Sequence, residues 1–196
     1  MMKKIVLAST SPFRRALLEK FNISFTCDKP DIDESALKDE TPEQLVARLS
    51  LEKVRACANN HSNALIIGSD QVAVHQGRIL GKPHTIDNAV AQLTSFSGQA
   101  VTFLTGLTVL DTESGEAKTL VEPFQVFFKT LSKESIEQYV NAEMPLNCAG
   151  SFKSEGLGIC LFEKLSGDDP NSLIGLPMIK LYELLNHFDV DVLAHQ

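Results

Sequence analysis

The feature that most constrains the fold is a short apolar run that leads directly into a helix start. Ile5–Leu7 predicts a buried strand, and Ser11 and Pro12 follow after only three small or hydroxyl-bearing residues. Serine is favoured as a helix N-cap, and proline is tolerated at the first helical position because the N–H that it lacks would be unpaired there. The segment therefore predicts a strand that joins a helix N-terminus almost without a loop.

The strand–helix junction also gathers groups that bind phosphate. A helix N-terminus offers unpaired N–H groups, hydroxyls can donate further hydrogen bonds, and guanidinium groups make forked, charge-assisted contacts. An ordinary strand–helix connection with arginines on its surface explains the same residues equally well. The candidate phosphate ligands at the junction are Ser9, Thr10, Ser11, Arg14 and Arg15.

Helix and strand patterns along the rest of the chain predict an α/β or α+β fold with a mixed sheet. Thr41, Pro42 and Gln44 form a capping-box pattern, and the polar turn at 111–117 between two β-rich runs is typical of a hairpin. We find no internal repeat and no low-complexity linker, so a single domain over 1–196 is expected. Helices are expected over 12–21, 42–59, 86–94, 133–142 and 171–188, the last broken near 177, and strands over 3–8, 25–27, 65–67 with an extension at 72–74, 101–110, 120–128 and 156–165.

Charge and composition limit the classes of partner. With 196 residues, 43% of them hydrophobic, the chain can bury a full core, and its formal net charge of −7 includes no long lysine or arginine run. Nonspecific binding to nucleic acid or to an anionic membrane surface needs clustered positive charge, so neither partner is expected. A few local cations together with a metal ion can still bind a polyanion in a cleft.

The cysteines and the N-terminal segment favour a cytoplasmic protein. Cys27, Cys57, Cys148 and Cys160 form neither a CxxC pair nor a zinc-ligand pattern, so buried, reduced thiols are expected. The first apolar run is too short for the core of a signal peptide, and no segment is long enough to span a bilayer. The histidines show no metal-ligand spacing.

Asp70 is the sharpest candidate for a catalytic residue. It follows an apolar strand and Gly68-Ser69, so we expect it at the C-terminal end of a strand, where open α/β sheets place their ligands. A carboxylate in that position can bind a divalent metal or take a proton from water. Taken alone, an aspartate that bonds to its own backbone in a turn is the simpler interpretation.

Other charged residues belong to loops or stand singly. Glu34 lies in an acidic loop, which is either solvated surface or the source of a carboxylate for Mg²⁺. Lys53 and Lys82 are single lysines, which mostly face solvent, although the glycine and proline that flank Lys82 fix its backbone. The glycine-rich stretch 149–158 includes Glu155, and it predicts either a close backbone approach to a ligand or a flexible loop.

Taken together and in this order, these segments resemble the Maf family of nucleotide pyrophosphatases. The similarity extends from Lys3 to about Lys180, which is nearly the whole chain. Coincidence at every one of these motifs is improbable. The matching motifs are LASTSPFRR, IDES, GSDQV, GKP, CAGSFKSEGLG and DPNSLIGLP.

The resemblance implies an elongated mixed β-sheet flanked by helices, with two lobes that enclose a nucleotide-binding cleft, and often a homodimer. It also implies hydrolysis of a nucleoside triphosphate to the monophosphate and pyrophosphate with a divalent metal cation, Mg²⁺ or Mn²⁺. By motif position, Asp70 is the general base or metal-linked carboxylate that activates water, and Glu34 helps to hold the metal. The implied phosphate contacts are Ser9, Ser11, Arg14, Arg15, Lys53 and Lys82.

Three positions separate this chain from the branch of the family that acts on thymidine and uridine triphosphates. That branch has arginine, threonine and glutamine where this chain has Phe13, Gln71 and Glu155, and all three residues match the branch assigned to 7-methyl-GTP. N7-methylguanine is cationic, so an aromatic ring can stack on it with a cation–π energy of roughly 0.5–2 kcal/mol. A carboxylate accepts charge-assisted hydrogen bonds from guanine N1–H and the exocyclic amine. Core packing of Phe13 and an ordinary surface acid at Glu155 are the alternatives.

Two rival functions remain open at this point. The first is the same hydrolysis of pyrimidine triphosphates, dTTP and UTP. The second is a nucleotide-binding regulator of cell division or septum formation in which hydrolysis is incidental. Asp70, Glu34 and the lysines favour catalysis, because a sensor needs no carboxylate that activates water.

Overall fold

The computed structural model describes residues 3–195 and divides the chain into two compact units. The first unit contains the chain up to Asp70, the segment Thr105–Glu122 and the chain from Asp169 onward. The second unit contains Gln71–Leu104 and Pro123–Asp168. Each unit is therefore assembled from segments that are distant in sequence.

The strands form a mixed sheet in the order β2-β1-β3-β5-β6-β7, with β4 paired to β3. β1 pairs in parallel with both β2 and β3, whereas the β3–β4 and β6–β7 pairs are antiparallel. The strands are β1 (Lys4–Ala8), β2 (Phe25–Asp28), β3 (Ala64–His75), β4 (Arg78–Leu80), β5 (Ala100–Asp111), β6 (Ala117–Phe128) and β7 (Phe162–Ser166). The helices are α1 (Pro12–Glu19), α2 (Pro42–Ala58), α3 (Ile86–Phe96), α4 (Lys133–Glu143) and α5 (Met178–His187), with short 3₁₀ helices at Ala149–Ser151, Leu157–Leu161, Pro170–Ile174 and Leu193–His195.

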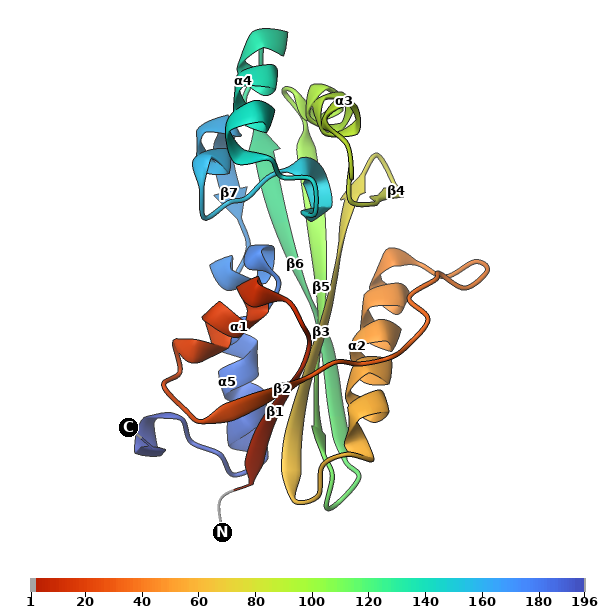
Figure 1. Cartoon of the computed structure of the whole chain (residues 1–196), viewed down its shortest axis with the longest axis vertical. Coiled ribbons are helices and arrows are strands. Elements are labelled where there is room, and N and C mark those ends of the chain that lie inside the picture. The colour runs from red at the N-terminus through yellow and green to blue at the C-terminus, as the bar shows by residue number, and fades with distance from the viewer. Residues whose placement is uncertain (1–2, 196) are drawn as a thin grey trace. The chain divides into compact units, whose positions relative to one another are not determined.

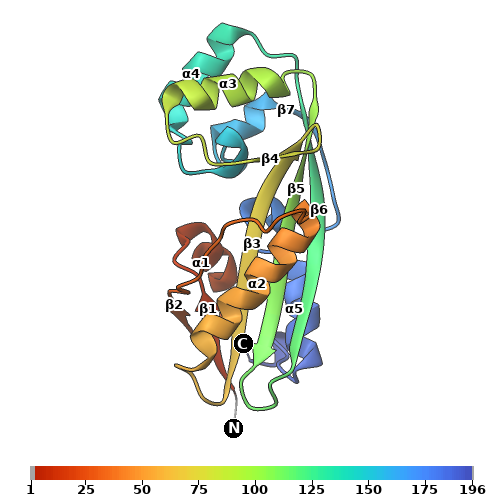
Figure 2. The same ribbon diagram turned by 90° about the vertical axis from the view of Figure 1, so that its right-hand side faces the viewer.

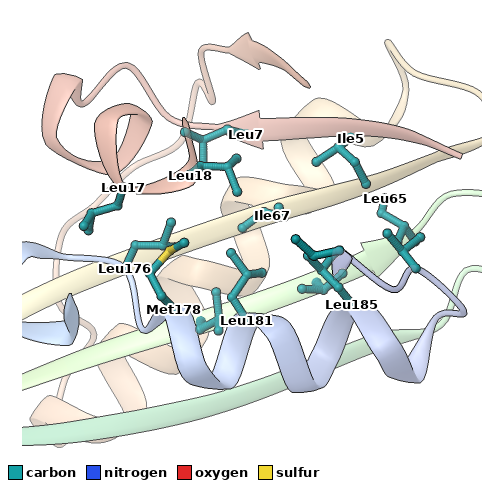
Figure 3. Packing of buried hydrophobic residues seen from close by; sticks show 14 of the residues in the cluster. Ile5, Leu7, Leu17, Leu18, Leu65, Ile67, Leu176, Met178, Leu181 and Leu185 are labelled. Carbon is teal, nitrogen blue, oxygen red and sulfur yellow. The ribbon is translucent and has the colours of Figure 1, made fainter. Parts of the chain in front are cut away.

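In the first unit the sheet is covered on both faces, with α1 and α5 on one face and α2 on the other (Figure 1). Successive side chains of a strand point to opposite faces. Ile5 and Leu7 accordingly pack with α1 and α5, and Val6 and Ala8 pack with α2. Figure 3 shows the first of these two cores, where Leu181 of α5 lies among the strand residues. Burial on both faces explains why these strands are continuous apolar runs.

Two glycines allow α2 to lie close to the sheet. A Cβ on Gly68 of β3 would stand 2.5 Å from the carbonyl oxygen of Ser50, and a Cβ on Gly106 of β5 would stand 2.1 Å from that of Val46. Real Cβ atoms do not approach backbone oxygens so closely, so no larger residue fits at either position without displacing the helix.

The second unit has an aromatic core. Phe128 lies at its centre, with ring centroids 5.2 Å from Phe96, 5.7 Å from Phe152 and 5.4 Å from Phe162. Tilted and edge-on ring pairs at these separations stabilise by about 0.5–1.5 kcal/mol each beyond the area that they bury. Helices α3 and α4 contact each other in this unit, as Figure 2 shows.

The structure confirms the mixed α/β class and most of the expected elements, and it corrects others. The strand expected over 156–165 begins only at Phe162, because Leu157–Leu161 forms a 3₁₀ helix. Cys27 and Cys160 are exposed, so the expectation of buried thiols is wrong for both, although all four cysteines are free. In the described part of the chain, no helix is both long and apolar enough to cross a bilayer.

Candidate active site

A buried lysine holds two carboxylates together in the first unit. Lys53 Nζ of α2 lies 2.6 Å from Asp70 Oδ1 and 2.8 Å from Glu34 Oε1. Lys53 is 5% exposed and Asp70 is 8% exposed, so water screens their charges little. Glu34 comes from an exposed loop and reaches the same ammonium group. Three of the predicted site residues are thus in direct contact.

The strand explains why Asp70 meets α2, and it corrects one expectation. Asp70 does not end a strand, since β3 continues to His75. The missing side chain of Gly68, two residues earlier, serves the close packing against α2 described above. Residues two apart share a face of a strand, so Asp70 points to the same side as Gly68. Gln71 is the next residue of β3 and the first residue of the second unit.

Arg14 of α1 interacts electrostatically with the same two carboxylates, those of Asp70 and Glu34. Burial lowers the pKa of its guanidinium, and the negative charges of Asp70 and Glu34 oppose that shift. Arg14 Nε donates a 2.8 Å hydrogen bond to the carbonyl oxygen of Gly175, and Ser69 Oγ donates a 2.9 Å bond to the same oxygen. One carbonyl therefore fixes both Arg14 and the residue that precedes Asp70.

That carbonyl depends on the conformation of Gly175. Its φ of +120° is strained for residues with a side chain, and an added Cβ would lie 3.4 Å from Arg14 Nε. The buried carboxylate of Asp169 accepts hydrogen bonds from the backbone N–H groups of Asn171 and Ile179. It thereby caps the 3₁₀ helix Pro170–Ile174 and also binds the first turn of α5.

The two serines of the strand–helix junction are hydrogen-bonded within it. Ser11 is the predicted N-cap of α1, and its hydroxyl accepts from the backbone N–H of Arg14 at 3.4 Å. Ser9 Oγ accepts from the backbone N–H of Ser11 at 3.1 Å. Each oxygen acts as an acceptor in these contacts, so each O–H can still donate to a ligand.

Phe13 and Arg15 lie on the surface of α1. Phe13 is 37% exposed, so core packing is not its role and its ring is open to a ligand. Arg15 forms an exposed ion pair with Glu19 at 3.0 Å, one helical turn later. Unlike Arg14, Arg15 therefore pairs with a carboxylate of its own helix and not with those that Lys53 contacts.

The loop that carries Glu34 is fixed by Arg48. Arg48 donates to both carboxylate oxygens of Glu40, at 2.6 and 2.8 Å, and to the carbonyl oxygen of Ser35 at 3.0 Å. These hydrogen bonds lower the pKa of Glu40 to about 2. The residue next to Glu34 is thereby tied to α2, the helix that carries Lys53.

In the second unit, Lys82 lies in a segment whose backbone is held by α3. Gln92 Nε2 donates to the carbonyl oxygen of Gly81 at 3.0 Å. Asn88 Nδ2 donates to the carbonyl oxygen of Pro83 at 2.9 Å. The backbone is thus fixed on both sides of the exposed Lys82 side chain, as the flanking glycine and proline favour.

The charges of Lys82 and Glu155 both affect the pKa of the Cys148 thiol in this unit. Burial raises the pKa of Cys148. The cations Lys153 and Lys82 oppose the rise, and the carboxylates Glu155 and Glu143 add to it. The second unit therefore has a charged region of its own, formed from loops.

The Glu34 and Asp70 carboxylates of the first unit are the type of oxygen donor that a hard divalent cation binds. Glu34 and Asp70 supply two carboxylates, and Mg²⁺ usually takes one or two from a protein and completes its shell with water and phosphate oxygens. Among residues 3–195, no three His, Cys, Asp or Glu side chains are grouped so that they could hold a metal by themselves. The phosphates of a substrate would have to complete such a site.

Several contacts of the site were missed by the sequence analysis. Ser69 and Gly175 stand inside motifs that it quoted, GSDQV and DPNSLIGLP, so their motif membership was the signal. The Arg48–Glu40 pair has no such signal, because its partners are joined only through the folding of an irregular loop.

The comparison with protein families agrees with this arrangement. The family described as "Maf-like protein" matches residues 4–188 of the chain. The chain belongs to the Maf-like protein family. The structure of the Staphylococcus aureus Ham1 protein resembles this Maf-like chain with a TM-score of 0.52 and 15% identity, over 94% of this chain and 99% of that one, which supports the fold alone.

Three curated relatives of this Maf-like protein carry the name "7-methyl-GTP pyrophosphatase". The protein from Colwellia psychrerythraea is 60% identical over 100% of this chain and 98% of its own length. The protein from Pseudoalteromonas translucida is 63% identical over 98% and 95%, respectively. The protein from Alcanivorax borkumensis is 56% identical over 92% of both chains.

Proposed function

We propose that this Maf-like protein hydrolyses 7-methyl-GTP to 7-methyl-GMP and pyrophosphate. The observation that carries the proposal is the identity of 56–63%, over 92–100% of the chain, to relatives with that printed activity. The contacts of the buried Lys53 with Asp70 and Glu34 support the class of reaction, because a phosphoanhydride hydrolase needs a base for water and cations for phosphate.

In the proposed reaction a water oxygen attacks the α-phosphorus. The new P–O bond forms as the bond from the α-phosphorus to the bridging oxygen breaks, and pyrophosphate leaves with the bonding electrons. Asp70 takes the proton from the attacking water. Arg14 and Lys53 stabilise the negative charge that grows on the phosphate oxygens, because in a site that excludes water such contacts are strong.

Lys53 has a second task in this scheme. It neutralises Asp70 and Glu34 before substrate arrives, which limits the cost of burying the Asp70 carboxylate. Glu34 and Asp70 would hold the divalent cation, which supplies charge neutralisation on the triphosphate and lowers the pKa of bound water. Ser9 and Ser11 donate hydrogen bonds from their hydroxyl groups to phosphate oxygens.

Recognition of the base is assigned to the exposed residues. Phe13 stacks on the cationic N7-methylguanine ring, which its exposure permits. Glu155, also exposed, accepts hydrogen bonds from N1–H and the exocyclic amine. Gln71 is included on the strength of its motif position, next to Asp70.

The direct test is pyrophosphate release from 7-methyl-GTP, GTP, dTTP and UTP, each with Mg²⁺ or Mn²⁺. The proposal expects the largest kcat/KM with 7-methyl-GTP. Faster turnover of dTTP or UTP would assign the chain to pyrimidine nucleotides instead. Tight binding without turnover under every metal would favour a nucleotide sensor.

A further inference from the structure

The turn that carries Glu155 is anchored to the end of α4. The backbone N–H of Leu157 donates a 2.7 Å hydrogen bond to Glu143 Oε2, two residues after Glu155. Two residues before Glu155, the backbone N–H of Lys153 donates a 3.0 Å bond to the hydroxyl of Tyr139. The backbone of the turn is therefore hydrogen-bonded to α4 on both sides of Glu155, which argues against the interpretation of this stretch as a flexible loop.

Glu143 makes this anchor with its main chain as well as its side chain. Lys153 Nζ donates to the carbonyl oxygen of Glu143 at 2.9 Å and lies 3.5 Å from Glu143 Oε1. Glu143 is the last residue of α4, where carbonyl groups have no partner within the helix, so the ammonium of Lys153 satisfies one of them. The Glu143 side chain is largely covered, whereas that of Glu155 is exposed.

Gly156 completes the anchor by its lack of a side chain. A Cβ at this position would lie 2.7 Å from Glu143 Oε2 and 3.0 Å from Glu143 Oε1. The residue that directly follows Glu155 therefore packs against the anchoring carboxylate, and a larger residue there would require that carboxylate to shift. Glu155 therefore stands in a turn whose backbone is hydrogen-bonded to α4 on both sides.

We propose that Glu143, assisted by Tyr139, is a positioning residue for nucleotide-base selection by Glu155. This inference rests on the proposed function, because it assumes that Glu155 contacts the base. Without the Glu143 carboxylate, the Leu157 N–H loses its acceptor and the turn gains conformations in which Glu155 misses the base. The reaction at the α-phosphorus does not involve Glu143, so its loss raises KM for the preferred nucleotide and leaves kcat nearly unchanged.

A double-mutant cycle tests this coupling. In Glu143→Ala, the ratio of kcat/KM for 7-methyl-GTP to that for UTP is expected to fall about fivefold to tenfold, as for the loss of one charge-assisted hydrogen bond, because uracil lacks the amine that guanine presents beside N1–H. In a Glu155→Gln background, the same change should leave the ratio within about twofold, because there is no longer a carboxylate to position. Glu143→Gln keeps an acceptor oxygen for Leu157 and should retain most of the ratio, and Tyr139→Phe should lower it less than Glu143→Ala.

Glu137→Ala is the matched control, because Glu137 is a half-exposed glutamate on the same helix that pairs only with Lys133 among the contacts of the described residues. It should leave the ratio unchanged. An equal loss of ratio from Glu143→Ala in both backgrounds would overturn the proposal, as would an unchanged ratio in the single variant.

Hydrogen exchange separates this inference from the proposed function. The Leu157 amide should exchange at least about tenfold faster in Glu143→Ala than in the wild type, with no such change in Glu137→Ala. Unchanged exchange would show that the anchor does not exist, whatever the substrate. If the wild type prefers another nucleotide, the substrate assignment fails, and the same cycle run with the nucleotide that it prefers decides the role of Glu143.

Discussion

The two units hold their charged side chains in different ways. In the first unit, Asp70 and Lys53 stand on a central strand and a helix, buried and paired with each other. In the second unit, Lys82 and Glu155 stand on exposed loops that are fixed by hydrogen bonds from α3 and α4. Regular elements in a core position side chains most rigidly, whereas loops vary with little cost to the core. Changes at the buried residues of the first unit should therefore lower kcat, and changes at the exposed residues Phe13 and Glu155 should alter KM and nucleotide preference.

The largest effect is expected from Asp70→Asn. The amide retains the shape of the side chain and an oxygen for Lys53, but it cannot take a proton from water. Steady-state pyrophosphate release should give a kcat lower by about 10²- to 10⁴-fold, with an unchanged circular dichroism spectrum. Asp87→Asn makes the same chemical change on exposed α3 and should have no effect. A rate near normal in Asp70→Asn would remove Asp70 from its assigned role.

The next largest effect is a change of nucleotide preference in the double variant Phe13→Arg, Glu155→Gln. Arginine repels the cationic base, and glutamine loses the charge-assisted contacts with guanine. The ratio of kcat/KM for 7-methyl-GTP to that for UTP should fall by about 10- to 100-fold, while kcat with the better substrate stays within about threefold. A fall in kcat with both nucleotides and no change in their ratio would mean that these exposed residues serve the reaction and not the base.

A substitution at Gly68 tests the rigid packing of the first unit. Gly68→Ala places a Cβ against the backbone of α2, so urea denaturation should show a loss of about 1–3 kcal/mol in the free energy of unfolding. Gly81→Ala is the control in the second unit, because an added Cβ there meets no atom within 4 Å. It should change stability by less than about 0.5 kcal/mol. Equal effects at the two positions would show that α2 is not held as closely as described.

The smallest expected effect is a dependence of stability on acid pH from Glu40. Arg48 lowers the pKa of Glu40 to about 2 from an ordinary value of 4.5. A carboxyl group with a lowered pKa in the folded state stabilises fully above its unfolded value, so this contribution should disappear as pH falls from 4.5 toward 2. Urea denaturation at a series of pH values should show a shallower slope in this range for Glu40→Gln. An identical slope in the two proteins would contradict the assignment.

The regular elements could largely be predicted from the sequence, because their signals are local. The N-caps Ser11 and Thr41 begin helices as expected, and the helices expected from 86 and 133 follow the N-caps Thr85 and Ser132, since a capping side chain bonds to a backbone group only a few residues away. The role of Gly68 was not predictable, because the reason for a glycine there is the approach of α2, which no neighbouring residue reveals.

The candidate site was predictable in its residues and not in its contacts. The family resemblance selected Asp70, Glu34 and Lys53, and the structure brings these three together. The bond from Arg14 to Gly175 joins residues 161 positions apart, so only folding can reveal it. The anchors of the loops likewise come from other elements, and this is why a glycine-rich stretch was indistinguishable from a flexible loop.

The measurement that tests the account most directly is the fate of oxygen from water. Hydrolysis of 7-methyl-GTP is run in H₂¹⁸O, and both products are analysed by mass spectrometry. Attack at the α-phosphorus predicts a single ¹⁸O atom in 7-methyl-GMP and none in pyrophosphate. Label in pyrophosphate, or release of orthophosphate in its place, would contradict the reaction assigned to Asp70, Lys53 and Glu34.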